Sequence, residues 1–156
     1  MRLFGKGPAL PQVHKTMPMD QIMRLAGEVE DIAQGGRVQA EALDDLSADL
    51  GVPREKLYAS LGASPHLELE TEHAVQFVVC SGGCQQRGAL VALRTLLDAR
   101  EERMEDSKPS FDVIPRQCLT RCQEGAVAEV RTPDGAAVLT AITAESLTEA
   151  LGEIFD

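Results

Sequence analysis

The feature that most constrains this chain is a pair of cysteine loops, each of which follows a run of residues typical of a β-strand. The four cysteines form two C-x3-C pairs, Cys80 with Cys84 and Cys118 with Cys122. Residues 75–79 (VQFVV) form a run rich in β-branched and aromatic residues before the first pair, and residues 111–114 (FDVI) predict a second strand before the second pair. Because loops at the same end of neighbouring strands can meet, we expect both pairs to converge on one site.

Four thiolates supply every ligand that a [2Fe–2S] cluster needs, two for each iron. The same residues could hold a structural zinc ion, although zinc pairs more often read C-x2-C. Two disulfides would also match the even cysteine count, but the N-terminus lacks the apolar core of a signal peptide, and we expect a reducing, cytoplasmic compartment. Four unrelated thiols are the simplest alternative. The spacing favours the iron–sulfur cluster and leaves the other interpretations open.

The residues beside the cysteines suit a cluster. Residues 81–83 read Ser-Gly-Gly, so the backbone can curl round the sulfur atoms, with glycine free to adopt a positive φ. An oxidised cluster with four thiolates carries a charge of about −2. Arg87, Arg116 and Arg121 lie within a few residues of a cysteine. We expect these arginines to offset that charge and to raise the reduction potential.

The charge and hydropathy of the chain exclude other classes of protein. A formal net charge of −10 argues against a nucleic-acid partner and favours more basic protein surfaces. No stretch approaches the ~20 apolar residues of a membrane span, so we expect no direct membrane insertion. The histidines His14, His66 and His73 have no ligand spacing with the cysteines, and we expect each at the surface. No complete active site is recognisable.

The chain divides at residues 62–65, where the periodicity changes. Residues 1–18 resemble an untethered or loosely docked tail. Residues 19–62 carry apolar stripes at helical spacing and predict a small helical bundle. Such a bundle buries little core alone, so we expect it to pack on a partner protein or a second copy of the chain, as a possible homodimer.

Residues 66–156 contain all four cysteines, and we expect them to fold and to hold the metal alone. They predict a strand, a helix through Leu97, a charged loop over 99–110, a second strand, a hairpin turning at 132–135, and a last helix from Thr143. This order is that of a minimal thioredoxin-like α/β layer. The predicted fold class is therefore α+β, with an N-terminal helical bundle before a thioredoxin-like [2Fe–2S] domain.

Several segments resemble the family of thioredoxin-like [2Fe–2S] ferredoxin subunits of NADH:quinone oxidoreductase (complex I). Residues 36–43, 50–53 and 56–58 resemble the helical N-terminal part of that family. Residues 118–126 resemble its second ligand pair and the strands that follow, and residues 139–147 resemble its closing helix. The resemblance covers residues 20–156, and the four-cysteine frame is its most specific part.

This resemblance implies a thioredoxin-like domain whose cluster is bound by Cys80, Cys84, Cys118 and Cys122. It also implies a place beside an FMN- and NAD-binding flavoprotein, or another redox subunit, in complex I, an NAD-linked formate dehydrogenase or a hydrogenase. We therefore expect one-electron transfer, with any NADH dehydrogenase-type activity belonging to the whole complex. The alternatives are a standalone thioredoxin-like ferredoxin and a four-cysteine zinc module without a redox role.

Overall fold

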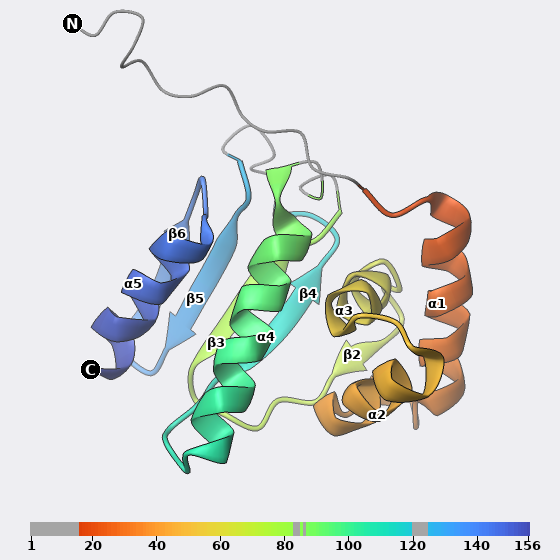
Figure 1. The fold of residues 1–156 in the computed structure, drawn as a ribbon, viewed down its shortest axis with the longest axis horizontal. Coiled ribbons are helices and arrows are strands. Elements are labelled where there is room, and N and C mark those ends of the chain that lie inside the picture. The colour runs from red at the N-terminus through yellow and green to blue at the C-terminus, as the bar shows by residue number, and fades with distance from the viewer. Residues whose placement is uncertain (1–15, 83–84, 86, 120–124) are drawn as a thin grey trace, which may run out of the picture.

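The computed structural model describes residues 16–82, 85, 87–119 and 125–156 (Figure 1). These residues form an α+β fold of five helices and six strands. The main sheet has the strand order β4-β3-β5-β6. Its strands are β3 (Gln76–Cys80), β4 (Asp112–Arg116), β5 (Ala128–Thr132) and β6 (Gly135–Leu139).

The pairing of the four strands follows from their connections. β3 and β4 run parallel, and the helix α4 (Ala89–Glu105) makes the crossover that a parallel pair requires. β5 is antiparallel to β3 on its other side, and β6 is antiparallel to β5. The β5–β6 turn falls at Pro133 and Asp134, as the sequence predicts.

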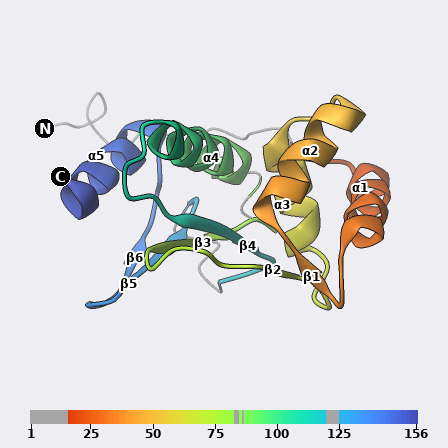
Figure 2. The ribbon, with the colours of Figure 1, turned by 90° about the horizontal axis from the view of Figure 1, so that it is seen from below.

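The sheet is covered by helices on one face. In Figure 2, α4 and α5 (Ala144–Phe155) lie on the same side of the four strands, while no described helix covers the opposite side. The side chains of Phe77 and Val79 on β3 and of Val130 on β5 join the hydrophobic core with those of the helices. No helix in the described part of the chain has both the length and the apolar character to span a membrane.

Three further helices stand beside the sheet, close to the predicted positions. They are α1 (Met19–Ile32), α2 (Ala40–Leu50) and α3 (Arg54–Gly62). Leu25 and Val29 on α1 and Leu43 on α2 are buried, as their helical spacing indicates. Gly51 ends α2 at a φ of 65°, a left-handed conformation that glycine adopts without strain. The short parallel pair β1 (Arg37–Val38) and β2 (Glu68–Leu69) was not predicted.

The helices and the sheet share one hydrophobic core. A single cluster of buried side chains includes Val29 of α1, Leu57 of α3, Phe77 of β3 and Leu147 of α5. α3 packs on both α4 and β4. The change of periodicity at residues 62–65 therefore marks a change of local structure inside a continuous core.

The predicted loop over residues 99–110 is wrong in its first half, because α4 continues to Glu105. Arg100 is buried on this last stretch, and its Nε donates a hydrogen bond to the carbonyl oxygen of Phe111 at 3.1 Å. The guanidinium of Arg103 stacks on the ring of Phe155, 4.0 Å from the ring centre. Long charged side chains that cover apolar surface keep this charged segment helical.

The expected tail over residues 1–18 needs a correction at its end. Residues 1–15 lie outside the described residues, but Met17 is part of the core and is only 5% exposed. Its backbone N–H donates a hydrogen bond of 2.9 Å to Oε1 of Gln85. The chain is therefore fixed to the sheet domain before α1 begins.

Candidate metal centre

The parallel pair β3–β4 brings the two cysteine loops to the same edge of the sheet. Cys80 is the last residue of β3 and lies in register with Arg116, the last residue of β4. Cys118 follows two residues later. Cys84 and Cys122 lie outside the described residues. The strands that precede the two loops therefore end side by side, and the convergence of the four cysteines on one site stays a prediction.

Hydrogen bonds join the two loops directly after the strands. Ser81 donates from its backbone N–H, at 2.7 Å, and from its hydroxyl group, at 3.1 Å, to the carbonyl oxygen of Arg116. The thiol of Cys80 donates a weak hydrogen bond to the carbonyl oxygen of Gln117, with Sγ 3.8 Å away. The first residues of the two loops therefore pack directly against each other.

Two glycines allow this close approach. A Cβ atom at Gly82 would overlap the carbonyl oxygen of Gln117 in the opposite loop. A Cβ atom at Gly62, in the last turn of α3, would lie 2.6 Å from the hydroxyl oxygen of Ser81 and 3.1 Å from Cβ of Pro115. Gly82 has no positive φ, so the expectation of a left-handed glycine is wrong here: lack of space is what requires glycine. Gly83 lies outside the described residues.

The two described cysteines differ in exposure. The Cys80 side chain is fully buried and packs with Ala89 and Val127. The partly buried side chain of Leu119 packs against this cluster. Cys118 is exposed at the surface. A metal bound between them would therefore sit at the boundary of protein and solvent, where a partner protein can approach it.

A buried glutamine that the sequence analysis did not single out supports the first loop. Gln85 is 5% exposed, and its Nε2 donates a 2.9 Å hydrogen bond to the carbonyl oxygen of Ser81. Its Oε1 accepts the N–H of Met17, which lies 68 positions away in the chain. The side chain thus connects the cysteine loop to the segment that leads into α1. No local pattern of residues marks such a contact, so only the folded structure reveals it.

No protein-family model matches the chain, and no curated protein matches it. The interpretation of the site therefore depends on the residues of the chain itself. Among the described residues, no group of three or more His, Cys, Asp or Glu side chains is placed to bind a metal ion. The predicted ligand set includes two cysteines beyond those residues.

The arginines expected around the site are placed as follows. Arg116 lies at the end of β4 in register with Cys80, and its side chain is exposed. Arg87 is exposed in the turn before α4. Neither of them forms an ion pair with another described residue. Arg121 lies outside the described residues.

A groove of about 630 Å³ opens beside Cys118, between β4 and the segment around β2. Arg37, Arg116 and Arg131 contribute to its walls, together with Glu68 and Glu70. Because both signs of charge line it, the groove does not select a partner by charge alone. The groove does open Cys118, beyond the end of β4, to solvent.

Two of the three histidines lie among the described residues. His66 is exposed, as predicted, and its Nε2 lies 3.3 Å from Oε1 of Glu30. His73 is half-buried rather than exposed, and its Nε2 has no hydrogen-bond partner among the described residues. His14 lies outside them.

Proposed function

We propose that this chain transfers single electrons through a [2Fe–2S] cluster held by Cys80, Cys84, Cys118 and Cys122. The observation that carries the proposal is the parallel pairing of β3 and β4, whose carboxyl ends lie side by side. A hydrogen bond from Ser81 to Arg116 joins the two loops there. Thiolates are the ligands that these clusters use, and the chain offers two per iron. When bound, the cluster would accept and release one electron.

The protein surroundings suit that role. Cys80 is enclosed by apolar side chains, which keep water from the inner side of the site. Arg116 places a positive charge at the same edge. Because reduction adds negative charge to the cluster, this arginine would favour the reduced state.

We further propose that the domain is thioredoxin-like and that the chain is a divergent member of the [2Fe–2S] ferredoxin subunit family of complex I. Support comes from the order β3-α4-β4-β5-β6-α5 and from the parallel and antiparallel pairings of its strands. The partner would be a flavoprotein or another redox subunit of an NAD-linked oxidoreductase in the cytoplasm. The partner would exchange electrons with the cluster from the side of the molecule on which Cys118 is exposed.

Metal analysis and spectroscopy of the full chain test the cluster. Protein purified without oxygen should contain iron and acid-labile sulfide in equal amounts, and the reduced form should give an EPR signal. Changing any one of the four cysteines to serine should bleach or alter the visible spectrum, because oxygen is a harder ligand than sulfur. Val127→Ala is the control, since it loosens the packing around Cys80 and keeps every ligand. Zinc in stoichiometric amount, without sulfide, would refute the cluster and support the four-cysteine zinc module.

A further inference from the structure

The two edges of the main sheet are protected to different degrees. At one edge, β4 contains Pro115, which has no N–H to offer, and Gly62 of α3 lies against that proline. At the other edge, β6 has no neighbouring strand among the described residues. It contains neither proline nor a charged residue, and residues 135–138 are exposed. An edge strand without such protection readily pairs with another strand.

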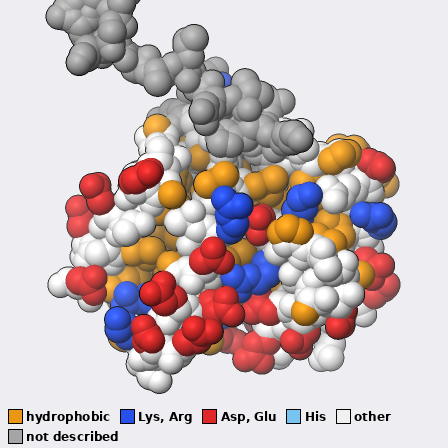
Figure 3. Space-filling model, viewed as in Figure 1, with side chains coloured by type: hydrophobic (Ala, Val, Ile, Leu, Met, Phe, Trp, Pro, Cys, Tyr) orange, Lys and Arg blue, Asp and Glu red, His pale blue; other side chains and the backbone are white. Residues whose placement is uncertain are grey.

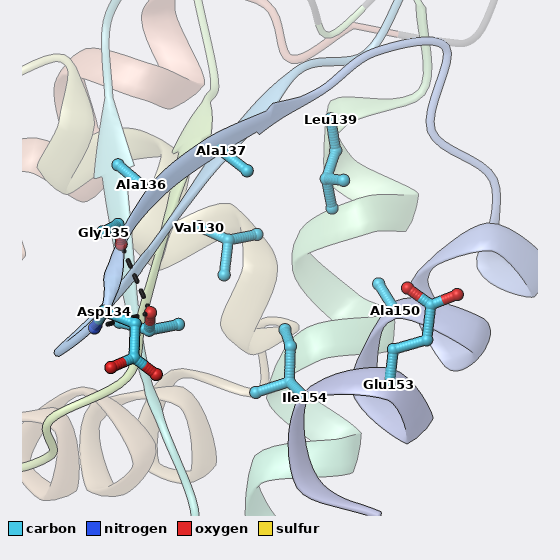
Figure 4. A pocket seen from close by; sticks show the side chains of 10 residues that line it. Val130, Asp134, Gly135, Ala136, Ala137, Leu139, Ala150, Glu153 and Ile154 are labelled. Atoms are coloured by element: carbon cyan, nitrogen blue, oxygen red, sulfur yellow. Dashed lines mark hydrogen bonds between the residues drawn. The ribbon is translucent and has the colours of Figure 1, made fainter.

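A groove lies beside this open edge, between β5, β6 and α5. It has a volume of about 320 Å³. In Figure 4, the side chains of Val130 and Ile154 point toward one another across it, and Leu139 points into it from above. Asp134 and Glu153 stand at its margins. The groove therefore has an apolar centre and acidic margins.

We propose that β6 accepts an extended, basic segment of a partner protein as a fifth strand of the sheet. The added strand would pair with the open backbone edge of β6. Every second side chain of a strand points to the same face, so its apolar side chains would reach the groove beside Ile154. Lysine or arginine side chains at the two ends of the segment, beyond the side chains that enter the groove, would lie near Asp134 and Glu153.

The charges on this side of the molecule favour a basic occupant. Glu145, Glu149 and Glu153 recur at the spacing of one helical turn on α5, and Figure 3 shows several acidic side chains on this flank, with basic ones at its lower end. The chain as a whole carries a net charge of −10. A second copy would bring the same acidic groups, whereas a basic segment would be attracted to them. The proposal does not depend on the metal.

The probe is a fluorescent short peptide with valines at its centre and lysines at both ends, added to the full-length chain. We expect binding by fluorescence anisotropy, weakened by salt, and none for the matching peptide of valine and glutamate. Glu153→Lys should weaken binding roughly fivefold more than Glu145→Lys, which changes the net charge equally but lies outside the groove. Equal losses in the two variants would mean general electrostatic attraction and would overturn the proposal.

Three further measurements test how the segment binds and whether a second copy of the chain takes its place. The same peptide with N-methyl groups along one backbone edge should bind much more weakly, because it cannot pair with β6; unchanged binding would refute strand addition. Ala150→Leu, which fills the groove from α5, should weaken the binding of the lysine peptide.

Sedimentation of the chain alone should show no dimer formed through β6. A dimer that dissociates on Val138→Lys would show that a second copy occupies this edge and that the proposed partner is wrong.

Discussion

The carbonyl oxygen of Arg116 accepts two hydrogen bonds from Ser81, one from the backbone N–H at 2.7 Å and one from the hydroxyl group at 3.1 Å. Ser81 directly follows β3, and Arg116 is the last residue of β4. The bonds therefore join the chain where the two cysteine loops begin. The bonds fix the relative position of the two loops through protein contacts alone.

Gly82→Ala should separate the two loops. A methyl group at this position has no room beside the carbonyl oxygen of Gln117, so one of the loops must move. We expect a loss of about 1–3 kcal/mol in the free energy of unfolding, together with loss of bound metal. The control is Gly27→Ala, on exposed helix surface with nothing within 4 Å, which should be neutral or stabilising by roughly 0.5–1 kcal/mol. Thermal unfolding and metal content of Gly82→Ala are compared with those of Gly27→Ala. A Gly82→Ala protein that is fully stable and loaded with metal would contradict the expected separation of the loops.

Gln85→Met should disturb the cysteine loop from the side of Met17. The substitution keeps the volume but leaves the N–H of Met17 and the carbonyl oxygen of Ser81 without their partner, at a cost of about 1–3 kcal/mol for each buried group. Hydrogen exchange of the Met17 amide should become faster whether or not metal is bound. In metal-loaded protein the EPR line positions should also shift. Gln39→Met, at an exposed glutamine, should change neither.

Arg116→Gln should lower the reduction potential by tens of millivolts, the order of one screened charge interaction. Arg121→Glu should act in the same direction if that side chain approaches the cluster. Arg94→Gln removes an equal charge from an exposed position on α4 and should have a smaller effect. Potentials from redox titration of the three variants give the comparison. Equal shifts for Arg116→Gln and Arg94→Gln would mean that the potential responds only to net charge.

Asp44→Asn should change how stability depends on pH. Burial raises the pKa of Asp44, although Arg54, with Nη1 3.7 Å away, partly opposes the shift. A carboxyl group with a raised pKa binds its proton more tightly in the folded state, so its contribution to stability grows as the pH falls through that pKa. On acidification, the urea concentration at the unfolding midpoint should therefore rise for the natural chain relative to Asp44→Asn. Asp45→Asn, at an exposed neighbour on α2, controls for the loss of charge, and a constant difference for Asp44→Asn would refute the assignment.

Local patterns predicted most of the helices and strands, for reasons visible in particular residues. The last helix begins where expected because Thr143 and Ser146 form a reciprocal capping box, with Ser146 N donating to Thr143 Oγ1 at 3.1 Å. The C-terminal half of α4 was missed, since its apolar stripe ends at Leu97. Its helical state depends on Phe111 and Phe155, which are distant in sequence.

The sequence by itself determined the paired cysteine loops and the strands before them, because both are patterns of neighbouring residues. Only the tertiary structure decided that Gly82 must be small, that Gln85 connects Met17 to Ser81, and that α3 supports the cysteine edge through Gly62. The contacts of Ser81 with Arg116 and of Met17 with Gln85 join residues 35 and 68 positions apart. Such contacts depend on how the folded chain fills space, and burial makes them specific because a buried polar group needs a partner.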